Sequence, residues 1–571
     1  MKLHHRHIFT LSVITSSILL THNETFAAFN GINSQQGIAV TSNASIPATA
    51  STSETIAIGN RAVANGKNTG LRAMLLGNLP NAQGGLSIGE NAESQENGIH
   101  IGHRTQKAAY GSRAGATIVG TDSDSGGLMS SVFGTGSKVK IDQNVKAFGL
   151  SNVQGTLASS VGAYNIIDAT KQTYDGMATA IVGAANTIEG SNGSTIFGVG
   201  NKISNSYVDP ALTAPQALSM LGGDLSVIGD TELASVGVMG GGNTVDYGRL
   251  STVNGVKNTL KGKNGDLAER NQITGYKNTV TDSDDTILTG TENTVTNGKQ
   301  NIVLGDQHNL VGDSQDQNKR NVVIGYSDNT EWKNISKTVA LGSDQKIEDD
   351  VKEAVLVGDK AEVKVSTAVA LGSSSLADRA AVSETAVTTS SGNADATNNE
   401  VYALEIADDA DKSAVKNTVK GELAAVSVGN SNATRQITNV AAGSADTDVV
   451  NVAQLKSVGN AVERNTTNIT NISNNLNQVR NQVDNLDRKV NKLDKRLTAG
   501  IAGATAIAFL ERPNAPGKSM VSVAVGGYRN ASAIAVGYAK NSENNKRTVK
   551  FGVGINTQKD IHWGGSLGYQ W

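Results

Sequence analysis

The sequence predicts a mainly β protein that combines a repetitive β-solenoid, a left-handed coiled coil and a short group of membrane-spanning strands. Three successive spacings of apolar residues support this prediction. Apolar residues precede a glycine at intervals of mostly 12 to 20 residues over much of the chain, recur every seven residues from Leu455, and alternate with small or polar residues over the last 54 positions. These periods are typical of stacked short strands, supercoiled helices and two-faced sheet strands, in that order.

The composition excludes several classes of protein. Aromatic residues make up only 4% of the 571 residues, while glycine occurs 63 times, which suits stacked repeats better than an ordinary globular core. The net charge of −3 includes no long run of one sign, so neither nucleic acid nor an anionic membrane surface is an expected partner. Cysteine is absent, which excludes disulfides, thiolate nucleophiles and cysteine-based metal sites.

Residues 1–28 have the pattern of a secretory signal peptide. Lys2 and Arg6 give a positive start, residues 8–20 form an apolar stretch of 13 residues, and small residues follow at the expected cleavage position near 27 or 28. The apolar stretch is too short to span a membrane as a helix. No later stretch reaches the length of about 18 apolar residues, so any later membrane contact is expected to come from strands.

Residues 29–375 repeat a motif in which one or two apolar residues precede glycine. Each repeat would supply two short strands, with glycine at turns that need a positive φ and asparagine at left-handed positions and in side-chain ladders. We therefore expect a β-solenoid head here, with an insertion at 376–425, where the repeat weakens. The repeated glycines are Gly59, Gly77, Gly89, Gly102, Gly120, Gly134, Gly149, Gly162, Gly183, Gly198, Gly229, Gly305, Gly325, Gly342, Gly358 and Gly372.

A heptad pattern over residues 455–497 predicts a left-handed coiled-coil stalk. Isoleucine at both a and d, as at Ile469 and Ile472, favours three strands, although Val490 with Leu493 alone would suit two. Asn465 occupies a d position, where a buried amide lowers stability but fixes register and oligomer state. The a positions are Leu455, Val462, Ile469, Leu476, Val483, Val490 and Leu497; the other d positions are Val458, Ile472, Val479, Leu486 and Leu493.

The last 54 residues predict four membrane-spanning strands with one bulky apolar face and one face of small or polar residues. Two of the three tryptophans, Trp563 and Trp571, lie in the last strand, where an interfacial aromatic girdle would use them. Four strands cannot close a barrel, whereas three chains would supply twelve. Strands and coiled coil thus both favour a homotrimer, whose 12-stranded barrel would leave room for three helices. The small residues expected to face this pore are Ala524, Gly526, Ala535, Gly537, Gly552 and Gly554.

Several segments resemble the trimeric autotransporter adhesins, the YadA-like family. The sharpest resemblance is to the neck of that family, which joins a wide trimeric head to the stalk, and it predicts a neck at 426–454. The head repeats resemble the β-roll of the family, although they are looser than in its most regular members. The matching segments are Val426-Ser-Val-Gly-Asn430, Arg435-Gln-Ile-Thr-Asn-Val-Ala-Ala-Gly443, Ala445-Asp-Thr-Asp-Val-Val-Asn-Val-Ala-Gln-Leu455, Ala499-Gly-Ile-Ala-Gly503, Pro516-Gly-Lys-Ser-Met520, Val525-Gly-Gly-Tyr-Arg529 and Ser532-Ala-Ile-Ala-Val-Gly537.

The resemblance implies an adhesin displayed on the bacterial surface by type V secretion. Residues 498–571 would form the outer-membrane anchor and export pore, inserted by the barrel assembly machinery with Trp571 as the C-terminal aromatic signal. The Asn465 layer would resemble the anion sites of related stalks. The head would attach to host extracellular matrix or cells, or support autoaggregation and biofilm formation. The alternative is a structural surface coat without a dedicated host ligand.

Four short motifs resemble catalytic or metal sites, but their contexts argue against these functions. His100-Ile-Gly-His103 lies in the repeat and lacks a nucleotide-binding βαβ pattern, and the Gly-x-Ser-x-Gly matches at 85–89 and 564–568 lie between no strand and helix. The segment Asp122-Ser-Asp-Ser-Gly126 lacks the later glutamate of a calcium loop, so a solvated turn is favoured over Ca²⁺. We expect no catalytic residue, cofactor or metal, and therefore no enzyme.

Overall fold

The computed structural model describes residues 28–30, 38–41, 49–50, 55–58, 63–64, 73–76, 81–82, 86–94, 98–107, 115–148, 152–221, 224, 226–229, 231–382, 386–388, 400–402 and 408–571. The charged start and apolar stretch of the predicted signal peptide lie outside these residues. The chain divides into two compact units, residues 1–436 and 437–571, which are described separately.

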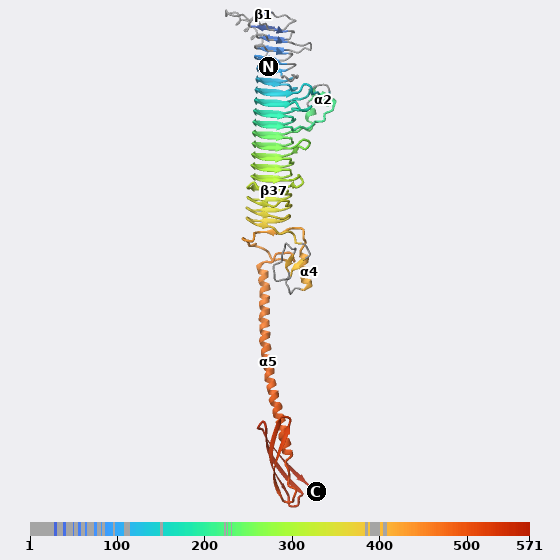
Figure 1. The fold of residues 1–571 in the computed structure, drawn as a ribbon, viewed down its shortest axis with the longest axis vertical. Coiled ribbons are helices and arrows are strands. Elements are labelled where there is room, and N and C mark those ends of the chain that lie inside the picture. The colour runs from blue at the N-terminus through green and yellow to red at the C-terminus, as the bar shows by residue number, and fades with distance from the viewer. Residues whose placement is uncertain are drawn as a thin grey trace, which may run out of the picture. The chain divides into compact units, whose positions relative to one another are not determined.

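The first unit is a β-solenoid, as Figure 1 shows. After an antiparallel β1–β2 pair, successive long strands pair in parallel, so each turn of the chain adds one strand to a 21-stranded sheet. Its strands are β1 (Ala28–Asn30), β2 (Ile38–Thr41), β4 (Thr55–Ile58), β6 (Ala73–Leu76), β8 (Leu86–Ile88), β10 (Ile99–His103), β12 (Thr117–Thr121), β14 (Ser131–Thr135), β16 (Ser159–Ala163), β18 (Ala180–Ala184), β20 (Thr195–Val199), β22 (Gly237–Gly241), β25 (Thr252–Val256), β28 (Gln272–Tyr276), β30 (Ile287–Thr291), β33 (Ile302–Asp306), β36 (Val322–Tyr326), β38 (Val339–Leu341), β40 (Val355–Val357), β42 (Val369–Leu371) and β46 (Val426–Ser427).

Shorter strands form the remaining sheets of the coils. They are β3 (Thr49–Ala50), β5 (Val63–Ala64), β7 (Asn81–Ala82), β9 (Glu93–Ser94), β11 (Gln106–Lys107), β13 (Asp124–Ser125), β15 (Lys138–Ile141), β17 (Ile166–Ala169), β19 (Thr187–Glu189), β21 (Lys202–Ser204), β23 (Thr244–Asp246), β24 (Gly248–Arg249), β26 (Thr259–Lys261), β27 (Ala268–Glu269), β29 (Thr279–Thr281), β31 (Thr294–Thr296), β32 (Gly298–Lys299), β34 (Asn309–Val311), β35 (Asn318–Lys319), β37 (Glu331–Lys333), β39 (Lys346–Ile347), β41 (Glu362–Val363) and β43 (Leu376–Ala377).

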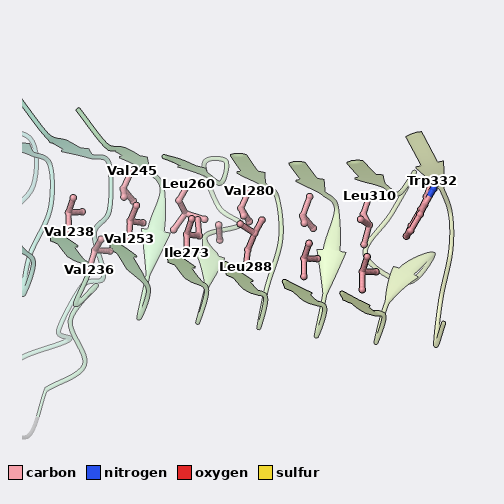
Figure 2. Close-up of a cluster of buried hydrophobic side chains, with 14 of the residues drawn as sticks. Val236, Val238, Val245, Val253, Leu260, Ile273, Val280, Leu288, Leu310 and Trp332 are labelled. Atoms are coloured by element: carbon pink, nitrogen blue, oxygen red, sulfur yellow. The ribbon is translucent and has the colours of Figure 1, made fainter. Parts of the chain in front are cut away.

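The core of the solenoid is a narrow column of buried side chains inside the coils. In Figure 2, Val253 and Leu260 lie in one coil and Ile273 and Val280 in the next, and all four are fully buried. Each coil contributes the second residue of its long strand and the second residue of its short strand to this column. Because each coil alone buries so little apolar surface, stability depends on the stacking of neighbouring coils.

The repeated glycine lies near the end of each long strand, where the backbones of neighbouring coils approach each other closely. At Gly275, φ is +128°, and a Cβ there would overlap the carbonyl oxygen of Gly290 in the next coil. Two predicted repeats are wrong, because Phe148 lies in a turn and Ile228-Gly229 lies in helix α3 (Ser226–Gly229). Each of these two segments belongs to an excursion between coils, so an apolar-Gly pair alone does not identify a strand.

An asparagine ladder runs along one turn of the coils. Nδ2 of Asn258 donates to Oδ1 of Asn243 at 3.1 Å and to the carbonyl oxygen of Gly275 at 2.8 Å. Oδ1 of Asn258 accepts from the backbone N–H of Asn278 at 3.0 Å. The predicted ladders are therefore present, but the predicted left-handed asparagines are not at these sites. The left-handed residue is the one before each ladder asparagine, such as Lys257, while the ladder members are Asn165, Asn186, Asn201, Asn243, Asn258, Asn278 and Asn293.

Two of the excursions from the solenoid contain helices. One carries helix α2 (Ala214–Leu221) and α3, and it packs beside the coils around buried Met177, Leu212 and Met220 (Figure 1). The other begins after β43 and returns at β46, and it contains β44 (Ala386–Thr388), β45 (Glu400–Tyr402) and α4 (Asp409–Thr418). Strand β46 pairs with β42, so the solenoid sheet continues across this second excursion.

The second unit contains the long helix α5 (Val452–Ala508) and an antiparallel sheet of four strands. Asn451 caps the helix, and its side chain accepts from the backbone N–H of Gln454 at 3.1 Å. The helix runs without a break from the predicted stalk into the predicted anchor. The strands are β47 (Ser519–Tyr528), β48 (Ala531–Asn541), β49 (Arg547–Asn556) and β50 (Ile561–Tyr569).

The ladder ends at His308, whose buried ring can respond to pH. Its backbone N–H donates to Asn293 at 2.9 Å, and its Nε2 lies 3.0 Å from the carbonyl oxygen of Gly325. Burial lowers the pKa of His308, although the Gly325 carbonyl and nearby Asp306 act against this shift. Nδ1 is buried and has no hydrogen-bond partner, so protonation would place an uncompensated charge in the coil.

We predict that His308 alone contributes a loss of head stability as the pH falls below about 6.5, because the unfolded chain then binds a proton that folded His308 does not. The variant His308→Asn, which extends the ladder, should lose this part of the pH dependence. Asp124 and Asp175 act in the opposite direction, since burial raises the pKa of each to about 7. The measurement is therefore the difference in melting midpoint between parent and variant, taken from pH 8 to pH 5; a difference that is constant with pH would contradict the assignment.

Candidate interaction surfaces and membrane anchor

An exposed apolar column follows the outer face of the long-strand sheet. The second residue of each long strand is buried, so the first and third residues point away from the core. Phe133 and Phe197 keep 41% and 49% of their surface exposed. An apolar surface this long marks an interaction site rather than an ordinary monomer surface. The apolar third residues are Ile101, Val119, Phe133, Val161, Val182, Phe197, Met239, Leu304, Ile324, Leu341, Val357 and Leu371.

A second exposed apolar stripe runs along α5. Its members are the predicted a and d residues, and Val462 and Ile472 keep 59% and 65% of their surface exposed. Asn465 is exposed on the same helix, seven residues from both Val458 and Ile472. A helix with a heptad stripe of this length is typical of a coiled coil whose partner helices are other chains.

The four-stranded sheet has two unlike faces. The bulky residues of one face are exposed, as at Val525 with 73%, whereas the small residues of the other face lie against the last turns of α5. A Cβ on Gly526 would overlap the carbonyl oxygen of Ala502 and the backbone nitrogen of Ala506. Small side chains on the strands and on α5 thus allow the sheet and the helix to pack closely together.

The other residues predicted to face a pore lie on this same helix-facing side. Ala535 is buried and Ala524 packs against the same apolar cluster. A Cβ on Gly537 or Gly552 would meet Leu510, while a Cβ on Gly554 would meet the ring of His562. Trp571, by contrast, is the last residue and is almost fully exposed.

Polar contacts hold α5 to the sheet, and sequence analysis missed them. Lys550 on β49 donates to the carbonyl oxygen of Leu510, just beyond the C-terminal end of the helix. Arg496 on the helix pairs with Asp560 in the β49–β50 turn at 3.1 Å. Because a cation near the last carbonyls of a helix is favourable, Lys550 fixes the end of α5. The lysine stands out in the sequence as a large cationic side chain on the small-residue face.

His562 fills a notch between helix and sheet. Its ring lies so close to Gly503 on α5 and to Gly554 on β49 that a Cβ on either glycine would overlap it. The alternation of strand β50 predicts that His562 lies on this face, but it does not identify the helix residue that it meets. Both glycines are therefore needed to admit the imidazole.

Arg435 is a further missed residue, at the end of the solenoid. The glycine column ends at Gly372, and the next group that a Cβ there would meet is the guanidinium of Arg435. Its Nη1 donates to Oγ of Ser375 at 3.0 Å and to the carbonyl oxygen of Val428 at 2.6 Å. Arg435 thus covers the end of the glycine column, next to the β42–β46 pair.

The segment before α5 is tied to the first turn of the helix. Oε1 of Gln454 accepts from the backbone N–H of Gly443 at 3.0 Å, and its Nε2 donates to the carbonyl oxygen of the same glycine at 3.0 Å. The carboxylate of Asp448 accepts from the backbone N–H of Ser444 at 2.7 Å. These contacts explain why the predicted neck motif needs an amide and a carboxylate at this spacing.

The four short motifs that resemble catalytic or metal sites form no common site. His100 is buried in the solenoid, whereas His103 pairs with Glu90 at 3.4 Å. Asp122 pairs with Arg104 at 2.7 Å, while the next aspartate, Asp124, is half-buried in a strand. Within the residues that the structure describes, no group of three His, Cys, Asp or Glu side chains could hold a metal ion. In the same residues, no helix is both long and apolar enough to cross a membrane.

Comparison with known proteins identifies the two ends of the second unit. Residues 512–571 match the YadA-like membrane anchor domain, and residues 436–478 match the coiled stalk of trimeric autotransporter adhesins. These two segments are similar to the stalk and anchor of YadA-like trimeric autotransporter adhesins, which confirms the predicted family resemblance. The predicted fold class of solenoid head, helical stalk and C-terminal sheet is confirmed as well.

Three curated relatives with similar segments are named as autotransporter adhesins. The chain is 32% identical to the autotransporter adhesin NhhA of Neisseria meningitidis over 154 residues, which is 27% of this chain and 22% of the relative. It is 32% identical to EhaG of Escherichia coli O157:H7 over 144 residues, 25% of this chain and 8% of that one. It is 51% identical to the trimeric autotransporter adhesin AtaA of Acinetobacter over 72 residues, 12% and 2% of the two chains. The chain thus aligns with less than a quarter of each relative's length.

We predict that Gly503→Val loosens the contact between α5 and the sheet, because the new side chain overlaps the ring of His562. Overpacking of this kind costs about 1–3 kcal/mol. Hydrogen exchange of the β50 peptide, measured on the full chain in detergent, should therefore become about 5- to 160-fold faster. Adding His562→Ala removes the overlap and should restore slow exchange. Equal exchange in Gly503→Val and the parent would show that this notch does not position the helix.

Proposed function

We propose that three copies of this chain form a surface adhesin that is anchored in the bacterial outer membrane and exports its own head by type V secretion. The observation that carries this proposal is the continuity of α5. One helix bears an exposed heptad stripe over most of its length and then lies along the small-residue face of a four-stranded sheet. A stalk that passes directly into a membrane pore needs both features in one helix.

The edges of the sheet support three copies. Within the described residues, β47 pairs with β48 alone and β50 with β49 alone, so both edge strands keep one side without a partner. The strands are 9 to 11 residues long, the length that a tilted strand needs to span a bilayer. An open edge is not tolerated in lipid, and three chains would close a barrel of twelve strands.

The two exposed apolar surfaces support the same assembly. The stripe on α5 would form the core of a three-stranded coiled coil, with Asn465 as a layer that fixes register and holds an anion. The apolar column on the head would meet its two copies along the axis of the head. Each surface is repeated in every chain, so one threefold axis buries both.

The proposed barrel places Ala524, Gly526, Ala535, Gly537, Gly552 and Gly554 toward the pore. Three helices inside a barrel leave little volume for side chains on its wall, which explains the small residues there. The exposed opposite face, with Val525 among its residues, would contact lipid. Insertion would use the barrel assembly machinery, with Trp571 as the terminal aromatic signal, after export by the signal peptide of residues 1–28.

The head would then attach the cell to host extracellular matrix or host cells, or to other bacteria in autoaggregates and biofilms. Three copies per fibre and many fibres per cell make weak contacts avid. The function needs no catalytic residue or cofactor, and we propose that the chain is not an enzyme. A structural coat without a dedicated host ligand remains the second candidate, because the looser head repeats carry no recognised ligand motif.

Binding to immobilised proteins separates these two candidates. Cells that display the full chain should bind at least one matrix protein, or one another, more than cells that display an anchor without residues 29–425. If the two strains bind and aggregate equally, the adhesin proposal fails and the coat is favoured.

We predict that Gly526→Leu lowers surface display of the head more than Val525→Leu does. The leucine at 526 would overlap the backbone of α5 at Ala502 and Ala506, whereas residue 525 faces outward. Protease accessibility of the head on intact cells, divided by the total anchor in the membrane, measures display. Equal display by both variants would contradict either the strand orientation or the self-export mechanism.

A further inference from the structure

The apolar column on the head is interrupted over three consecutive coils. Strands β25, β28 and β30 follow one another in register, and their third residues are Asn254, Thr274 and Thr289. The strand before them carries Met239 at this position and the strand after them carries Leu304. The interruption is therefore a single block and not a scatter of polar residues along the sheet.

The first residues of two of these strands are also polar, whereas the third strand, β30, begins with Ile287. Thr252 begins β25 and Gln272 begins β28, and they lie on the same outer face as the third residues. We name the five residues Thr252, Asn254, Gln272, Thr274 and Thr289 the polar belt. Neighbouring parallel strands lie about 4.8 Å apart, so the belt is roughly 10 Å tall along the sheet.

The belt consists of neutral hydrogen-bonding groups that its own chain leaves open. Asn254 is half-buried, and Gln272, Thr274 and Thr289 are exposed. Within the described part of the chain, the side-chain amides of Asn254 and Gln272 make no hydrogen bond, although the nearby ladder residue Asn258 makes several. The belt therefore has donors and acceptors available for groups outside the chain.

We infer that the polar belt forms a hydrated hydrogen-bonding layer on the axis of the head, shared by three copies of the chain and bounded by dry apolar layers on both sides. This inference rests on the proposed trimer. Three copies would gather six side-chain amides and nine hydroxyls around one axis. A buried amide or hydroxyl without a partner costs about 1–3 kcal/mol, so these groups need water or one another.

The layer would also fix how the three heads align along their axis. An apolar column that repeats in every coil is matched almost equally well after a slip of one coil. A slip at the belt instead places Asn254 against Met239, or Thr289 against Leu304, and leaves polar groups without partners. The belt thus has the role in the head that a buried asparagine has in a coiled coil.

The test compares the same substitution at matched positions of two strands. Thr274→Gln lies at the third residue of β28 in the belt, and Ile324→Gln lies at the third residue of β36 in the apolar column. Heating the full chain in detergent, while hydrogen exchange of the long-strand peptides is followed, gives the melting midpoint of the head. We expect Thr274→Gln to leave this midpoint unchanged and Ile324→Gln to lower it by about 5 °C or more.

Two other outcomes would overturn the inference, each in a different way. If both variants lower the midpoint equally, the layer is dry and the inference fails, while the trimer stands. If neither variant lowers it, the long-strand face is not an interface, and the head part of the proposed trimer fails as well; the mass of the detergent-extracted chain then tests the anchor separately. Thr274→Val is a control for folding and should melt no lower than the parent, since the belt gives up stability for specificity.

Discussion

Backbone hydrogen bonding at the edges of the C-terminal sheet is the constraint on which the proposed architecture depends. Strands β47 and β50 each leave one row of N–H and C=O groups without a partner among the described residues of the chain. In hydrocarbon each such group costs several kcal/mol, so the edges must pair with other chains. The proposed threefold barrel would satisfy them, and it would then require three helices in its pore, three stalk helices beyond it and three heads.

The need for hydrogen-bond partners also explains the solenoid, on a smaller scale. A single coil does not supply hydrogen-bond partners for all the polar groups in its turns. The side chains of Asn258 and its ladder neighbours therefore form hydrogen bonds to the next coil. Gly275 and the glycines aligned with it allow the backbones to approach closely enough for this ladder. Where the glycine column stops, at Gly372, the guanidinium of Arg435 lies in the place of the next glycine carbonyl. Long-range order along the head is thus the sum of repeated short-range contacts.

The spacing of apolar residues along the chain is the feature from which the structure can be predicted best. The alternation of strand β47 predicts that Val525 is exposed and that Gly526 is buried, because side chains on a strand alternate strictly between two faces. The heptad likewise predicts the stripe on α5. Apolar-Gly pairs were less reliable, since Ile228-Gly229 has the repeat pattern but lies in helix α3.

Contacts between elements could not be predicted in the same way. The meeting of His562 with Gly503 depends on the rotation and height of α5 against the sheet, which no local pattern specifies. The role of Arg435 depends on where the coils stop stacking. His308 occupies the place of the next ladder asparagine, and only the ladder geometry relates the two residue types.

The mass of the detergent-extracted chain tests the central claim most directly. Analytical ultracentrifugation, with the bound detergent matched in density, should give three times the mass of the mature chain at all protein concentrations tested. A mass of one or two chains under conditions that preserve the strand circular dichroism would contradict the closed threefold barrel, and the account of the stalk and head would fail with it.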